Sequence, residues 1–160
     1  MLLVRSLFFT VLLPGTVTLL IPYWLVSSRN IKASQQGQPF RYLGLPLIVV
    51  GAAGLLACVW QFFSEGRGTL APIDAPKELV VRGLYKYVRN PMYVFVVTIM
   101  IGEAILFLST AIMTEAVIFF ALAFLFVVFY EEPALRRQFG ESYERYAQTV
   151  GRWLPRLKSH

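Results

Sequence analysis

The sequence predicts an all-α integral membrane protein, with four transmembrane helices and a C-terminal amphipathic helix. Its 160 residues are 57% hydrophobic and only 15% charged, and the mean hydropathy is +0.61. Soluble domains have about a quarter of their residues charged, so this composition excludes an ordinary soluble globule. Three long apolar blocks supply enough chain for the four spans. We expect one domain over residues 1–160, because a chain of this length and polarity is too short for two soluble cores.

The first two spans are apolar runs without a charged side chain, residues 6–26 and 43–63. Each is long enough to cross a hydrocarbon core of about 30 Å at a helical rise of 1.5 Å per residue. Pro14-Gly15 and Pro22 interrupt the first helix and are expected to kink it. Gly51 and Gly54 are expected to let the second helix approach a neighbouring helix closely.

The third apolar block, residues 91–130, is too long for a single span. A polar pair near its middle, Ser109-Thr110, predicts a tight turn there. The block is therefore expected to form an antiparallel hairpin of two spans, residues 91–109 and 111–130.

Two acidic residues, Glu103 and Glu115, lie inside this hairpin, roughly 9 Å below its turn at a rise of 1.5 Å per residue. They fit a proton-sharing pair, as in a pump or transporter. They also fit side chains that snorkel to the outer interface. We favour snorkelling, because the pair lies far from the basic face.

The basic residues predict the orientation. If the chain crosses four times, one side carries twelve of the fifteen Lys and Arg residues: Arg5, Arg67, Lys77, Arg82, Lys86, Arg89, Arg136, Arg137, Arg145, Arg152, Arg156 and Lys158. The positive-inside rule places this side, and both termini, in the cytoplasm, and the short chain suits a prokaryotic plasma membrane. Anionic membrane lipids are expected partners of the basic face, whereas nucleic acid is not.

The C-terminal amphipathic helix follows from an apolar stripe. Its members recur at helical spacing: Leu135, Phe139, Tyr143, Tyr146 and Val150. Charged residues occupy the opposite face, so one helix is expected to lie on the membrane surface or to cap the bundle. With one cysteine, Cys58, and one histidine, His160, no disulfide, metal site or histidine base is expected.

The segment before the third span has the strongest local signal. Asn90 is expected to cap a helix that begins at Pro91, and the N–H groups of the first turn carry a partial positive charge that suits an anion. Taken alone, the segment also fits orientation charges with an interfacial belt of Tyr85, Tyr87 and Tyr93.

A series of landmarks runs in order through residues 77–155, half of the chain. They are Gly83-Leu84-Tyr85, Arg89-Asn90-Pro91-Met92-Tyr93, Gly102, Glu131-Glu132, Leu135, Phe139-Gly140, Tyr143, Tyr146 and Pro155. This series resembles the isoprenylcysteine carboxyl methyltransferase family and its phospholipid N-methyltransferase relatives. The resemblance implies a polytopic membrane enzyme that binds S-adenosylmethionine without a Rossmann domain, between its last two spans and its polar tail.

The resemblance also implies the cofactor contacts, which are Lys77, Glu78, Leu79, Val80, Tyr85, Asn90, Pro91, Met92, Tyr93 and Glu131. The helix start at Asn90 is expected to receive the cofactor carboxylate, and Glu131 to accept from its amino group or ribose. Tyr85 or Tyr93 would face the sulfonium. The chain has Asn90 where the family usually has His, and Val127 where prenylcysteine enzymes have a substrate-binding Arg. The second departure argues against a prenylcysteine carboxylate as substrate.

The expected function is S-adenosylmethionine-dependent methyl transfer to a lipid-like or other hydrophobic small molecule. A carboxylate or thiolate acceptor needs no base, whereas an amine needs a proton acceptor, for which Glu132 and Tyr146 are candidates. The alternatives are an oxidoreductase similar to membrane sterol reductases and a non-enzymatic small transporter or scaffold. The acceptor, the catalytic residue and the oligomeric state stay open.

Overall fold

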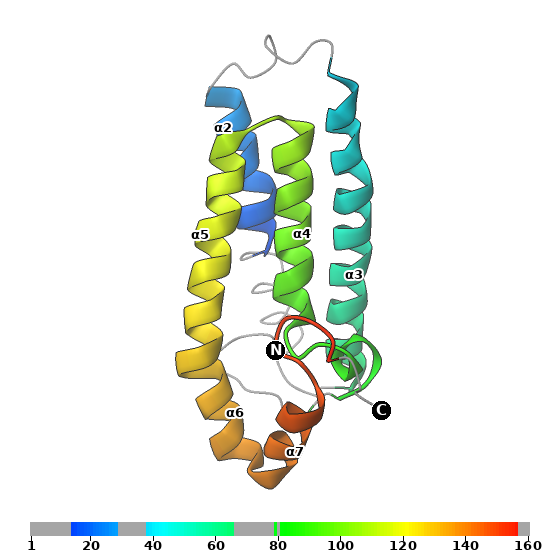
Figure 1. Ribbon diagram of the computed structural model, residues 1–160, viewed down its shortest axis with the longest axis vertical. Helices are drawn as coiled ribbons and strands as arrows, with labels where there is room; N and C mark the ends of the chain where they lie inside the picture. Colours follow the sequence, from blue (N-terminus) through cyan, green and yellow to red (C-terminus); the bar gives the residue numbers. More distant parts are fainter. Residues whose placement is uncertain (1–13, 29–37, 66–78, 80, 157–160) are drawn as a thin grey trace.

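The computed structural model describes residues 14–28, 38–65, 79 and 81–156, and this part of the chain is helical with no strand. The long helices stand side by side, and the chain doubles back below them (Figure 1). The elements in chain order are η1 (Thr16–Leu20), α2 (Ile21–Ser28), η3 (Pro39–Leu43), α3 (Gly44–Glu65), η4 (Gly83–Lys86), α4 (Pro91–Leu106), α5 (Thr110–Phe126), η5 (Val127–Glu131), α6 (Glu132–Phe139) and α7 (Glu141–Thr149). Of the short elements, η1 and η5 are π-helical turns and η3 and η4 are 3-10 turns.

Among the described residues, two helical stretches are long and apolar enough to cross a membrane, Pro39–Gln61 and Thr110–Phe139. Two more are apolar but shorter, Thr16–Ser27 and Pro91–Leu106. The all-helical prediction is thereby confirmed, with two candidate spans, while four transmembrane helices stay a prediction. Residues 6–13 of the first predicted span lie outside the described residues.

The α4–α5 hairpin turns where the sequence predicts it. α4 ends at Leu106, three residues before the expected boundary, and α5 begins at Thr110. Ser109 is the N-cap of α5, and its hydroxyl accepts a hydrogen bond from the Ile112 amide at 3.3 Å. The turn therefore closes with a serine cap, which replaces one missing backbone acceptor of the new helix.

The two glutamates of this hairpin do not reach out to an interface, so the snorkelling prediction is wrong. Glu103 is 8% exposed. Its Oε2 atom and both carboxylate oxygens of Glu115 are buried and have no hydrogen-bond partner within the described part of the chain. For Glu103 the reason is the central place of α4, which contacts α3, α5 and η1 and so presents little outward surface.

Close packing of α3 on α4 depends on small residues. A Cβ atom built at Gly51 would lie 2.6 Å from Ile99 Cγ1 and 3.0 Å from the Phe95 carbonyl oxygen, and one at Gly54 would overlap the Phe95 ring. These separations are too short for non-bonded carbon atoms, so only glycine fits. The prediction that Gly51 and Gly54 permit a close helix contact is confirmed.

Gly51→Val should therefore separate α3 from α4 and lower the free energy of unfolding by about 2 kcal/mol, because the added methyl groups overpack the contact. Thermal unfolding in detergent, followed by circular dichroism, measures this loss. Ala53→Val on the exposed face of α3 is the matched control and should change the stability by less than about 0.5 kcal/mol. Equal midpoints for the two variants would contradict the expectation.

The sequence predicts that the fourth span ends at residue 130. The helix instead continues through η5 into α6 and forms one helical stretch, Thr110–Phe139. The π-helical turn η5 carries the chain across the predicted boundary without breaking the helix. Such turns shift the register of the side chains that follow, and they are frequent at functional sites. Here the shift coincides with Glu131 and Glu132.

The C-terminal segment is two helices, so the prediction of a single amphipathic helix is wrong. α6 ends at Phe139, Gly140 has a φ of +50°, and α7 then doubles back (Figure 1). A φ in this region favours glycine, which has no Cβ to clash. The reversal lets the apolar stripe pack on itself: Tyr143, Tyr146 and Val150 are buried against Leu79, Leu135, Phe139 and Ala147.

Candidate functional site

Four segments from the second half of the chain meet at the end of the bundle remote from the α4–α5 turn: η4, the start of α4, the η5–α6 junction and the tail after α7 (Figure 1). The tail lies alongside the residues that precede α4. The Arg89 amide donates to the Gly151 carbonyl at 2.8 Å, and the Asn90 amide donates to the Arg152 carbonyl at 3.3 Å. The C-terminal tail is thus docked directly beside the start of α4.

α4 begins at Pro91, as predicted, but Asn90 does not cap it. The Asn90 side chain makes no capping hydrogen bond, and its Nδ2 donates to the Arg152 carbonyl at 3.2 Å. The capping prediction is wrong because the docked tail supplies a carbonyl oxygen that holds the amide on the other side. Asn90 is 7% exposed, and the first turn of α4 keeps its N–H groups clear of a capping side chain.

Tyr93 and Glu131 form a polar pair between the first turn of α4 and η5. The Tyr93 hydroxyl donates to Glu131 Oε2 at 3.1 Å, and both residues are partly buried. Two of the residues implied as cofactor contacts, 38 positions apart in the sequence, are thereby brought into direct contact.

The η4 turn carries Tyr85 and is anchored on two sides. Its Leu84 amide donates to Gln61 Oε1 of α3 at 3.1 Å, and the Tyr85 carbonyl accepts from the Tyr146 hydroxyl at 2.7 Å. Burial raises the pKa of Tyr85 and of Tyr146 above the ordinary value of a tyrosine. Both phenols therefore stay protonated at neutral pH, and the hydroxyl of Tyr146 acts as a donor.

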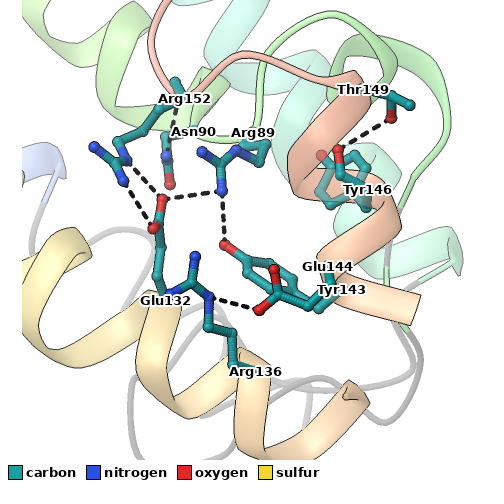
Figure 2. A network of polar contacts seen from close by, with 9 residues as sticks. All are labelled: Arg89, Asn90, Glu132, Arg136, Tyr143, Glu144, Tyr146, Thr149 and Arg152. Atoms are coloured by element: carbon teal, nitrogen blue, oxygen red, sulfur yellow. Dashed lines mark hydrogen bonds and ion pairs between the residues drawn. The ribbon is translucent and has the colours of Figure 1, made fainter. Parts of the chain in front are cut away.

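A buried ion cluster ties the tail to the bundle. Glu132 is 4% exposed and accepts from Arg152 Nε at 2.6 Å and from Arg152 Nη2 at 2.9 Å. Its Oε1 also pairs with Arg89 Nη1 at 3.1 Å, and the same Nη1 donates to the Tyr143 hydroxyl at 3.1 Å. Figure 2 shows the carboxylate between the two guanidinium groups. We call Glu132, Arg89, Arg152 and Tyr143 the Glu132 cluster.

The hydrogen bond from Arg152 to Glu132 raises the pKa of the Arg152 guanidinium above its ordinary value. The bond is bidentate, because two nitrogens of one guanidinium reach the two oxygens of one carboxylate. Such pairs define both distance and orientation. The cluster therefore sets where the chain continues after Arg152.

Trp153 follows directly and packs among aromatic rings of two helices. Its ring centroid lies 6.2 Å from that of Tyr93 on α4, 5.1 Å from that of Phe120 and 6.2 Å from that of Phe124, both on α5. The first two contacts are edge-on, at 72° and 64°, and the third is stacked at 25°. The indole Nε1 is buried and has no hydrogen-bond partner among the residues that the structure describes.

Some of the residues implied as cofactor contacts lie at the same end of the bundle. Those that meet at this end of the bundle are Tyr85, Asn90, Pro91, Met92, Tyr93 and Glu131. Leu79 packs against the tyrosines of α7. Lys77, Glu78 and Val80 lie outside the described residues.

Sequence reasoning missed the parts of the tail that complete this region, Arg152 and Trp153, and the pairing of Arg89 with Glu132. Arg152 is 20 positions from Glu132, so no helical spacing links them. The available signal was Gly151, which bridges to Val88 and whose missing side chain permits the tight turn that follows. A Cβ at Gly151 would collide with the Leu154 carbonyl.

The arrangement suits a ligand with an anionic end, a cationic centre and polar hydroxyls. The helix start can receive an anion, Glu131 can accept hydrogen bonds, and the aromatic rings can face a cation. Within the described ranges no group of three His, Cys, Asp or Glu side chains is placed to hold a metal ion. The donor set therefore fits S-adenosylmethionine, whose parts have these properties.

Comparison with known proteins identifies a family. A family model described as phospholipid methyltransferase matches residues 39–142, from the start of η3 to the start of α7. No curated protein matches the chain. The matched segment covers well over half of the chain, including Tyr93, Glu131 and Glu132, and it ends before Arg152 and Trp153.

Proposed function

Because the chain belongs to the phospholipid methyltransferase family, we propose that it transfers a methyl group from S-adenosylmethionine to a lipid-like or other hydrophobic acceptor. Family membership makes it a methyltransferase of membrane-associated substrates. The observation that supports the cofactor is the Tyr93–Glu131 hydrogen bond, at 3.1 Å, beside a helix start without a side-chain cap. This juxtaposition offers an anion receiver and a hydrogen-bond acceptor in one place.

When bound, S-adenosylmethionine would supply a methyl group from its sulfonium, and neutral S-adenosylhomocysteine would be the leaving group. The N–H groups of the first turn of α4 receive the cofactor carboxylate. Glu131 accepts from the amino group or the ribose, and the Tyr93 hydroxyl holds Glu131 in orientation. The rings of Tyr85 and Tyr93 face the cation. Met92 and the segment from Lys77 to Val80 complete the proposed contacts.

Neither candidate base is free to take a proton. Glu132 is bound by Arg89 and Arg152, and Tyr146 donates its hydroxyl proton to the Tyr85 carbonyl. We assign Glu132 and Tyr146 to holding the tail and η4 in place. Acceleration then comes from positioning an acceptor that has an available lone pair. An ammonium headgroup would first lose its proton to water, and its neutral amine would then accept the methyl group.

The site is proposed to lie at the cytoplasmic face of the membrane. The elements that surround it carry many of the basic residues of the chain, among them Arg82, Lys86, Arg136, Arg137 and Arg145. Four helices would cross the bilayer, and both termini would be cytoplasmic. A hydrophobic acceptor would then enter sideways, from the lipid, between helices.

Two measurements on the purified protein test this function. Calorimetry in detergent should show binding of S-adenosylhomocysteine and no binding of NADPH. Incubation with radiolabelled S-adenosylmethionine and a total lipid extract should label a lipid product. Binding of NADPH alone would favour the reductase alternative, and a folded protein that binds neither cofactor and labels no lipid would refute the proposal.

Tyr93→Phe should weaken binding of S-adenosylhomocysteine about 10-fold, since a hydrogen bond to a charged group contributes roughly 1.5 kcal/mol. The lost hydroxyl leaves Glu131 free to rotate. Tyr130→Phe is the matched control, because Tyr130 is next to Glu131 in the chain but 49% exposed. The same calorimetric titration measures both variants, and equal affinities would count against a role for the Tyr93 hydroxyl.

A further inference from the structure

We propose that Trp153 is the acceptor-side wall of the site and determines which hydrophobic acceptors reach it. This inference rests on the proposed methyl transfer. Trp153 lies outside the segment that the family model matches.

The indole connects two helices at the end of the bundle where the proposed cofactor contacts lie. It touches Tyr93 in the first turn of α4 and both Phe120 and Phe124 on α5. In Figure 1 the tail, drawn in red, passes beside the lower end of α4. Trp153 therefore occupies the space between α4 and α5 that a sideways entrance would use.

The two sides of the indole differ in character. On one side, Phe120 and Phe124 are 38% and 39% exposed on an apolar helix that is long enough to cross a membrane. On the other side, the Tyr93 hydroxyl donates to Glu131. One side chain thus separates a lipid-compatible surface from the polar pair, and an acceptor that comes from the lipid must pass or contact it.

The indole nitrogen indicates the chemistry of the acceptor. Trp153 Nε1 is buried and has no hydrogen-bond partner among the described residues. An unsatisfied buried donor costs free energy, which an incoming oxygen acceptor would recover. An amphipathic lipid supplies both parts: acyl chains for the phenylalanine side, and a phosphodiester or carbonyl oxygen for the indole N–H.

The indole is held by contacts of the chain on both sides of it. The bidentate bond from Arg152 to Glu132 and the backbone bonds to Gly151 and Arg152 position the residue before the indole. The next residue, Leu154, is 77% exposed. Beyond Leu154, Arg156 Nη1 donates to the Gln148 carbonyl. The indole is therefore anchored through the residues before and after it, which fixes its place between the phenylalanines of α5 and Tyr93.

Kinetics on two variants test the wall, with phosphatidylethanolamine in phosphatidylcholine vesicles and a total lipid extract as acceptor probes. Trp153→Ala should raise the acceptor KM about 10-fold, as expected for removing an aromatic anchor, and should allow additional lipids of the extract to be labelled. The Kd for S-adenosylhomocysteine should stay within about twofold, because the proposed cofactor contacts remain. Trp153→Phe, which keeps a ring but removes the N–H, should raise the KM by a smaller factor.

Trp60→Phe is the control for these variants, because the Trp60 side chain is 74% exposed on α3. Wild-type protein that neither binds S-adenosylhomocysteine nor labels lipid would refute the proposed function itself. If the wild type is active and both Trp153 variants keep its acceptor KM and product range, the role of Trp153 is refuted. The proposed methyl transfer would still stand. A parallel fall of cofactor affinity and thermal stability would also refute the proposed role of Trp153, because it would indicate a purely structural role.

A second readout needs no activity. The chain has three tryptophans, so Trp24→Phe and Trp60→Phe together leave Trp153 as the single fluorophore. In vesicles of brominated phosphatidylcholine its emission should fall relative to vesicles without bromine, because an acyl chain reaches the indole. Equal emission in the two vesicles would place Trp153 away from lipid and overturn the inference.

Discussion

Glu132→Ala should release the C-terminal tail and lower the free energy of unfolding by about 3 kcal/mol, at the low end of the cost of breaking a buried ion pair. The variant leaves the Arg89 guanidinium, whose side chain is 8% exposed, without its anion. It also removes both bonds that hold Arg152. We choose the low end because the Arg152 side chain is 33% exposed, and water would solvate it after the carboxylate is lost.

Glu144→Ala is the matched control for this prediction. Glu144 pairs with Arg136 at 3.0 Å, a separation similar to those in the Glu132 cluster, but both side chains are 50% exposed. Exposed pairs contribute at most about 1 kcal/mol, so this variant should unfold close to wild type. Thermal unfolding and limited proteolysis of the tail measure the difference. Equal melting temperatures and equal tail cleavage in the two variants would show that burial of the Glu132 cluster contributes nothing.

Glu131→Ala should have a large effect of a different kind. We expect at least a 100-fold loss of S-adenosylhomocysteine affinity and of methyl transfer, which corresponds to about 2.7 kcal/mol for a charged hydrogen-bond acceptor in a partly buried site. The melting temperature should fall little, because the carboxylate pairs with the Tyr93 hydroxyl and not with a buried cation. The two adjacent glutamates would then have different roles: Glu131 in ligand binding and Glu132 in stability.

Glu141→Ala provides the comparison, since this acid is exposed at the start of α7. It should bind and transfer like wild type. If Glu131→Ala keeps wild-type affinity, then Glu131 is not a cofactor contact. If instead it unfolds at the same low temperature as Glu132→Ala, the loss of activity reports on folding and the assignment also fails.

The C-terminal tail supplies contacts to the candidate site. The matched family segment ends at residue 142, yet the carbonyl that holds Asn90, the cation that holds Glu132 and the indole that packs on Tyr93 all come from residues 152 and 153. Truncation after α7 would remove these three contacts together. The last part of the described chain is therefore integral to the site and is not a surface extension.

The apolar composition, the turn at Ser109, the helix start at Pro91 and the small residues of α3 could all be predicted from the sequence. Each depends on local properties: hydropathy over about 20 residues, the missing N–H of proline, the missing side chain of glycine. The resemblance added the set of implied cofactor residues, and the structure brings Tyr93 and Glu131 of that set into contact.

Tertiary structure alone decided what Asn90, Gly140 and the two adjacent glutamates do. Asn90 has the right residue type and position for a cap, but a carbonyl 62 positions away holds its amide. Gly140 divides a stripe that has perfect helical spacing, because folding back buries its tyrosines. Glu131 and Glu132 are the same residue type at adjacent positions. Their contacts differ, because Glu131 accepts from Tyr93 whereas Glu132 pairs with Arg89 and Arg152. Helical periodicity records neighbours three and four residues apart, whereas these partners meet only when the chain has closed on itself.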